Sequence, residues 1–197
     1  MQTVSAGKDL HFCLDRQFTS AEQCTEIWRL LGCDYQWLQI SPGPLNGRIR
    51  VERQQGMILV SIQADQALLV QGARNPDWVP FTIEHTDNIA EHRHFGEALS
   101  PRTLGGFNTR LDQTLLRTSP GGSQIGAVLL DRRRIEQMAA LDPFGRLQDH
   151  LDGSNTAVLS KASHQGLKQM MERPAWQGVD AHGCYHADLL DGKPLDD

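Results

Sequence analysis

The chain has 197 residues, of which 39% are hydrophobic and 22% are charged, as in an ordinary water-soluble globular protein. Its formal net charge is −5, whereas a free-standing nucleic-acid-binding domain usually has a basic surface, so composition argues against direct DNA binding by this chain. The four cysteines form no CxxC pair, and neither a signal peptide nor an apolar stretch of membrane-spanning length is visible. We therefore predict a cytoplasmic protein with reduced thiols.

The chain begins with a polar stretch and continues into a helix. Residues 1–18 show no regular period, so we predict an extended N-terminal arm there. Thr19 and Ser20 supply hydroxyl caps, and acidic and amide residues follow in the first turn. Four apolar residues then recur at helical spacing, namely Cys24, Ile27, Trp28 and Leu31. With Gly32 as a C-terminal stop, the pattern predicts a short amphipathic helix.

The next segment carries a hairpin pattern. A Pro/Gly loop at 41–44 leads into residues of alternating character, with Arg48 and Arg50 on one face. A polar turn at 54–56, which includes a glycine, precedes an apolar run at 57–62. This combination predicts two antiparallel strands joined by a tight turn.

Short apolar runs between glycine and proline turns continue to residue 131. Besides the hairpin, we predict strands at 35–40, 67–70, 78–83, 107–116 and 125–130. From residue 132 the period changes, and we predict helices at 132–141, 147–151 and 163–173. Strands at this spacing followed by helices predict a mainly β fold, a β-barrel or sandwich followed by C-terminal α-helices and α+β overall. The predicted units are a barrel at 19–131, a helical region at 132–173 and a flexible tail at 174–197.

One string in this pattern is distinctive. Residues 39–48 read Gln-Ile-Ser-Pro-Gly-Pro-Leu-Asn-Gly-Arg and resemble part of the N-terminal cupin-like sensor domain of AraC-type transcription regulators. Further parts follow in a consistent order, including Gln71-Gly72, the turn at 118–122 and the exit into a helix at 128–132. The resemblance covers roughly residues 17–173. It implies a cupin-like, jelly-roll type β-barrel with an interior small-molecule pocket, followed by helices that serve dimerisation and contact a DNA-binding domain.

The resemblance also sets the expected partners. AraC-type regulators bind DNA through two helix-turn-helix units, and no such pair fits into 174–197. We therefore expect DNA contact only through a domain absent from this chain. The chain itself is either the sensor half of a longer regulator or a stand-alone relative. The other expected partners are a second copy of the chain and a small-molecule effector, with no membrane partner. Leu167, Met170 and Met171 are the candidate dimerisation residues, although packing onto the chain's own barrel explains this apolar stripe equally well.

A small-molecule pocket needs mostly apolar walls with a few placed polar groups. The candidate ligand-binding residues on predicted strands are Trp37, Arg48, Arg50, Trp78 and Phe81. Because strand faces alternate, Arg48 and Arg50 point the same way, either inward to an anionic ligand or outward to solvent. Burial of two unpaired guanidinium groups is costly, which favours the outward direction. The three aromatic residues fit a plain core as well as a pocket.

Histidines supply the strongest catalytic pattern. His92 and His94, with His85 upstream and Glu97 after them, resemble the metal-binding motif of cupin enzymes. The spacing to Glu97 is too short, and residues 113–149 contain no further histidine, so we predict surface or loop histidines and no metal site. We also predict no catalytic residue and no cofactor. A small cupin-like metalloenzyme that uses the three histidines is the alternative function, and an adaptor without a ligand is a third.

Overall fold

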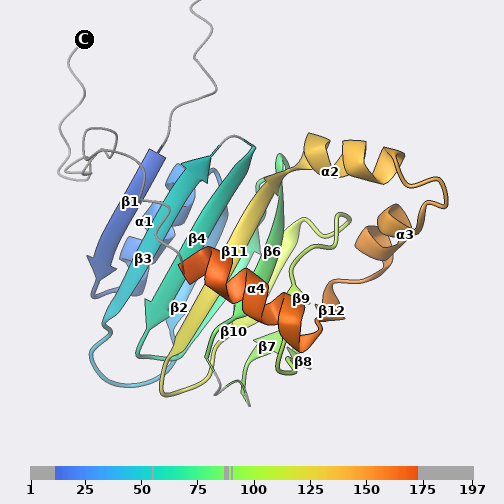
Figure 1. Cartoon of the computed structure of the whole chain (residues 1–197). Coiled ribbons are helices and arrows are strands. Elements are labelled where there is room, and N and C mark those ends of the chain that lie inside the picture. The colour runs from blue at the N-terminus through green and yellow to red at the C-terminus, as the bar shows by residue number, and fades with distance from the viewer. Residues whose placement is uncertain (1–11, 55, 87–88, 90, 173–197) are drawn as a thin grey trace, which may run out of the picture.

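Figure 1 shows the computed structural model of the chain, which describes residues 12–54, 56–86, 89 and 91–172. The described part contains two antiparallel sheets and four helices, so the mainly β prediction is confirmed. Within these residues the strands form two separate sheets and do not close into one barrel. The predicted flexible tail lies outside the described residues.

The larger sheet has seven strands in the order β1-β3-β4-β11-β6-β9-β12. In chain order they are β1 (Phe12–Phe18), β3 (Gly47–Gln54), β4 (Met57–Ala64), β6 (Trp78–Glu84), β9 (Thr103–Gly105), β11 (Ser123–Asp131) and β12 (Thr156–Val158). The smaller sheet has five strands in the order β2-β5-β10-β7-β8. They are β2 (Asp34–Gln39), β5 (Leu68–Ala73), β7 (Arg93–His94), β8 (Glu97–Ala98) and β10 (Gln113–Arg117).

The predicted hairpin is confirmed as β3 and β4, which pair along their whole lengths. Gly56 in the connecting turn has a φ of 74°, a left-handed conformation that glycine adopts without strain. Ile49 and Val51 are fully buried, whereas Arg48 and Arg50 are exposed to solvent. The alternation that predicts the hairpin therefore also determines which face of the larger sheet turns inward.

The predicted N-terminal helix is confirmed as α1 (Ala21–Leu30). Ser20 occupies the N-cap position, and Gly32, with a φ of 74°, follows the C-terminal residue Leu31. The buried side of α1 packs against β2 and carries Ala21, Cys24, Thr25, Ile27 and Trp28. This side is the apolar stripe that the helical spacing indicates.

The three predicted C-terminal helices are confirmed as α2 (Arg132–Ala140), α3 (Arg146–Gly153) and α4 (Lys161–Glu172). Asp131 begins α2, because its Oδ1 accepts a hydrogen bond from the Arg133 backbone N–H over 2.8 Å. Figure 1 shows that α4 crosses the outer face of the larger sheet, and its contacts are with β11 and β4.

Buried side chains form two apolar clusters. The main core lies between the sheets and α1, and it contains residues such as Phe18, Ile27, Val51 and Leu68. A smaller cluster beside α2 and α3 is built from Val79, Phe107, Ile135 and Leu151. The strands of the larger sheet near its β6 and β9 side are therefore covered on both faces.

Five of the strands were not predicted from the sequence. Residues 12–18, the end of the predicted arm, form β1, which pairs with β3. The remaining four are β7, β8, β9 and β12, each only two or three residues long. Among the described helices, none combines the length and the apolar composition that a membrane crossing requires.

Candidate ligand cavity

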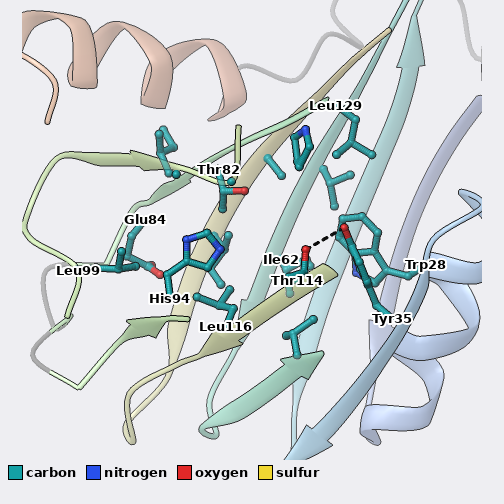
Figure 2. A pocket seen from close by; sticks show the side chains of 18 of the residues that line it. Trp28, Tyr35, Ile62, Thr82, Glu84, His94, Leu99, Thr114, Leu116 and Leu129 are labelled. Atoms are coloured by element: carbon teal, nitrogen blue, oxygen red, sulfur yellow. Dashed lines mark hydrogen bonds between the residues drawn. The ribbon is translucent and has the colours of Figure 1, made fainter. Parts of the chain in front are cut away.

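A cavity of about 80 Å³ lies between the two sheets. Side chains from α1 and from strands of both sheets line it (Figure 2). One buried water needs roughly 10–15 Å³, so the cavity has room for several waters or for one small organic molecule. Its apolar lining includes Val60, Ile62, Val70, Leu116, Ile125 and Leu129. Mostly apolar walls with a few polar groups are the usual composition of a small-molecule site.

Three aromatic side chains form one end of this cavity. Trp28 comes from α1, whereas Tyr35 and Trp37 lie two residues apart on β2 and therefore share a face. The Trp28 ring centroid lies 5.1 Å from that of Tyr35 and 6.3 Å from that of Trp37, typical distances for packed aromatic rings. Thr25 Oγ1 accepts a hydrogen bond from the Trp37 backbone N–H over 3.0 Å, which holds α1 against β2.

The two indole N–H groups at this end are unpaired. Trp28 Nε1 and Trp37 Nε1 are buried, and neither has a hydrogen-bond partner among the described residues. An indole N–H can only donate, and a buried donor without an acceptor costs about 1–3 kcal/mol. Both residues line the cavity, which makes a water or a ligand held there the candidate acceptor for these hydrogen bonds.

Thr114 connects the aromatic end to a buried arginine. Its Oγ1 donates to Tyr35 Oη over 3.3 Å, drawn as the dashed line in Figure 2, and accepts from Arg74 Nε over 3.1 Å. Arg74 Nη1 donates to the carbonyl oxygens of Gly106 and Asn108 over 2.8 and 3.1 Å. In contrast, Arg74 Nη2 is buried without a partner in the described part of the chain. Burial raises the pKa of Tyr35 to about 12, so this phenol keeps its proton.

His94 of β7 lies between the aromatic end and Glu84 in Figure 2. Its Nδ1 lies 3.3 Å from Asn155 Nδ2. Burial, with a smaller contribution from the charge of Arg74, lowers the pKa of His94 to about 4. The imidazole is therefore neutral at physiological pH.

Glu84 is an acidic residue at the end of the cavity opposite to Trp28 (Figure 2). Its Oε1 accepts hydrogen bonds from the backbone N–H groups of Thr86 and Gln124, over 3.0 and 3.1 Å, and from the Thr86 hydroxyl. Its Oε2 lies 3.1 Å from Nδ1 of the fully buried His92, although this contact lacks the alignment of a hydrogen bond. Neighbouring groups of the chain thus occupy both carboxylate oxygens.

The structure does not bring His85, His92 and His94 together as a metal site. His94 faces the cavity, and His92 lies beside Glu84. His85 and a methionine of α4 both lie against Gly126, which places His85 beneath α4. A Cβ added at Gly126 would lie 2.6 Å from His85 Nε2 and 2.3 Å from the methionine sulfur. All three histidines are buried, so none of them is a surface residue, and the prediction of loop positions is correct for His85 and His92 but not for His94, which lies in β7. Within the described ranges, no three His, Cys, Asp or Glu side chains gather into a group that could hold a metal ion.

The five predicted ligand-binding residues are separated by the fold. Of these, Trp37 lines the cavity. Trp78 packs against the main core beneath Arg53, and Phe81 stacks on Phe107 at a centroid distance of 5.9 Å in the second cluster.

Arg48 and Arg50 lie on the outer face of β3, away from the cavity. Arg48 Nε and Arg50 Nε contact Asp15 of β1 at 2.5 and 2.8 Å. Burial acts to raise the pKa of Asp15, but the hydrogen bonds and charges of the two arginines outweigh it and lower that pKa below its usual value. The outward direction favoured by the cost of burying guanidinium groups is the one observed.

The predicted dimerisation residues lie on two sides of α4. Met171 faces the chain's own sheet, where its sulfur lies against Gly126. Met170 points away from the sheet and is 44% exposed. Leu167 is partly buried. Packing on the sheet therefore accounts for part of the apolar stripe, and Met170 remains available for another surface.

Most of the polar groups around the cavity were missed from the sequence. The sequence pattern places Trp28 in a helix and Tyr35 in a strand but indicates no binding role for either. It indicates no binding role for Arg74, Thr114 and Glu84. One signal was present, because alternation places Tyr35 and Trp37 on the same face of β2. No local pattern indicates that Arg74 and Thr114, which are 40 residues apart, come together.

Protein-family models, curated proteins and solved structures were each compared with this chain, and none of the three comparisons found a match.

Proposed function

We propose that this chain is the ligand-sensing domain of an AraC-type transcription regulator, or a stand-alone relative of one, with a cupin-like jelly-roll core. The observation that carries the proposal is the mostly apolar cavity between two antiparallel sheets, with two buried, unpaired indole donors at one end. The string that resembles the family runs from the end of β2 into β3, and β3 pairs with β4, whose Val60 and Ile62 line the cavity.

In this proposal the domain binds its ligand without reaction. The oxygens of Glu84 are occupied by neighbouring groups, and the separated histidines give the metalloenzyme alternative no support. An adaptor without a ligand fits less well, because side chains leave the interior partly empty. The ligand-bound state would pass to DNA through a helix-turn-helix domain.

The domain pairs with a second copy of itself in this proposal. The exposed side of α4, with Met170 near its C-terminal end, is the proposed contact surface. Since Met171 already packs against the chain's own sheet, we assign the contact to Met170 rather than to the whole predicted stripe.

Ligand-observed NMR with a library of small fragments tests the cavity as a binding site. We expect several fragments to bind saturably and to compete with one another in wild-type protein. Ala127→Leu places three extra carbons in the cavity lining and should abolish this binding. Ala162→Leu makes the same change at an exposed position of α4 and should leave binding unchanged.

Circular dichroism and thermal unfolding establish that both variants fold before their binding is compared. Absence of any saturable fragment in the wild type would contradict the proposed function. The same conclusion follows if fragments bind a folded Ala127→Leu variant as tightly as the wild type.

A further inference from the structure

The polar groups at the aromatic end of the cavity have a common character. Trp28 Nε1, Trp37 Nε1 and Arg74 Nη2 are buried donors without partners among the described residues. Indole and guanidinium groups donate hydrogen bonds and accept none. A molecule that completes this end of the cavity must therefore bring acceptor atoms.

Arg74 adds a buried positive charge, and the carboxylate of Asp112, at an exposed position, acts on it by charge. The contacts of Arg74 within the described residues are to the Thr114 hydroxyl and to the carbonyl oxygens of Gly106 and Asn108, and none is to a carboxylate. A buried guanidinium with an unpaired N–H is unfavourable, and an anion near Nη2 relieves this cost. Thr114 and Gly106 themselves line the cavity, so the guanidinium lies directly behind its wall.

The carboxylate of Glu84 does not oppose an anion at this end. Figure 2 shows Glu84 and Leu99 at one end of the cavity and Trp28 and Tyr35 at the other, with His94 between them. The carboxylate of Glu84 is thus placed away from Trp28 and Tyr35, and the cavity has an acidic end and an aromatic end.

The remaining walls determine the body of the ligand. Aliphatic side chains of β4, β5, β10 and β11 form both sheet faces of the cavity, and the rings of Trp28, Tyr35 and Trp37 close it. Such a surface favours a flat apolar group over a polar chain such as a sugar. The cavity volume of about 80 Å³ limits this body to about the size of one ring.

We propose that the cavity selects a small carboxylic acid with a ring-sized apolar body, its carboxylate directed to Trp28, Trp37 and Arg74. This inference rests on the proposed function as a ligand-sensing domain and specifies the chemical class of the ligand. The two indole N–H groups donate hydrogen bonds to the carboxylate, and the positive charge of Arg74 behind the wall attracts it, which together supply the selectivity.

Titration calorimetry with phenylacetate, 2-phenylethanol and 2-phenylethylamine tests the class, because the three probes share one ring and differ in the polar group. We expect phenylacetate to bind at least about tenfold more tightly than the alcohol, and no binding of the amine. Tighter binding of the alcohol or the amine would overturn the carboxylate assignment and leave the cavity established as a ligand site. Binding of none of the three would also overturn it, while the fragment experiment decides the proposed function separately.

Variants identify the groups that hold the carboxylate. Arg74→Gln removes the charge and should weaken phenylacetate binding about tenfold or more while leaving the alcohol nearly unchanged. Trp37→Phe keeps a ring and removes one donor, so it should weaken phenylacetate by several-fold. Trp78→Phe, a tryptophan that does not line the cavity, is the matched control and should bind as the wild type does.

The arginine also bonds two backbone carbonyls, so Arg74→Lys provides a second test that retains the charge if the glutamine variant does not fold. It should keep the preference for the acid over the alcohol. Loss of this preference in a folded lysine variant, or its full retention in Trp28→Phe and Trp37→Phe, would contradict the assigned contacts.

Discussion

Two titratable residues line the same cavity under different local conditions. Glu84 has hydrogen-bond donors from Thr86 and Gln124 on one oxygen. His94 has one polar neighbour, an asparagine amide at 3.3 Å, and burial beside the charge of Arg74 disfavours its protonated form. The two side chains therefore differ in their hydrogen-bonding environment, and the pKa shift of His94 follows from its burial and from the charge of Arg74.

His94 makes stability depend on pH. Its folded-state pKa of about 4 lies below the roughly 6.5 of a histidine in an unfolded chain. Between these values the unfolded chain binds more protons, so the free energy of unfolding should fall as pH is lowered from about 6.5 to 4, by up to about 3 kcal/mol. Chemical denaturation across this range measures the slope.

His94→Gln should remove most of this dependence, whereas His150→Gln, at an exposed position, should retain it. NMR titration of the His94 ring gives the pKa directly. A midpoint near 6.5 in the folded protein would contradict the expected shift.

Strand β6 shows how an element connects the two faces of the larger sheet. Thr82 and Glu84 point into the cavity, whereas Val79 and Phe81 lie in the second cluster on the opposite face. The residue after the strand, His85, lies beneath α4, and its carbonyl oxygen accepts a hydrogen bond from Lys168 Nζ over 2.8 Å. The cavity wall and the last described helix are thus separated by the thickness of one strand.

Gly126 determines how closely α4 approaches the sheet. A Cβ at this position would lie 2.3 Å from Met171 Sδ, so Gly126→Val should push α4 away and destabilise the fold by about 1–3 kcal/mol. Gly166 of α4 has open space around it, and Gly166→Ala should stabilise by about 0.5–1 kcal/mol. Thermal unfolding of both variants measures whether each change stabilises or destabilises the fold. Hydrogen exchange of the α4 amides shows whether the change in stability lies in α4. Unchanged exchange in Gly126→Val would show that this glycine does not control the packing of α4.

The elements that sequence predicted are those with a local cause. The β3 and β4 hairpin follows from alternation and a glycine turn, and α1 follows from apolar spacing between Ser20, which takes the N-cap position without a side-chain cap, and Gly32. β7, β8, β9 and β12 have only two or three residues, so pairing with distant strands defines them rather than any pattern of their own. The burial of His92 has the same kind of cause. The carboxylate beside it is that of Glu84 in β6, so no local pattern around His92 indicates its burial.

At the scale of the whole molecule, the proposed homodimer gives a direct prediction. Light scattering after size exclusion should yield twice the chain mass for the wild type and a lower mass for Met170→Glu, because a charge at a buried subunit contact is costly. Gln137→Glu adds the same charge at an exposed position of α2, outside the proposed surface, and should remain dimeric. A monomeric wild type at high protein concentration would contradict both the dimer and the assigned surface.

The pairing of β12 with β9 bears on association between copies of the chain. Thr156 to Val158 align with Gly105 to Thr103, and the Gly106 backbone N–H donates to Asn155 O nearby over 2.9 Å. Without this late segment, β9 would present unsatisfied backbone groups at the border of the sheet, which is a template for association between chains. The predicted barrel at 19–131 therefore ends before the strand that pairs with β9, and among the described strands the border at this side of the sheet is β12, whose three residues keep the edge short.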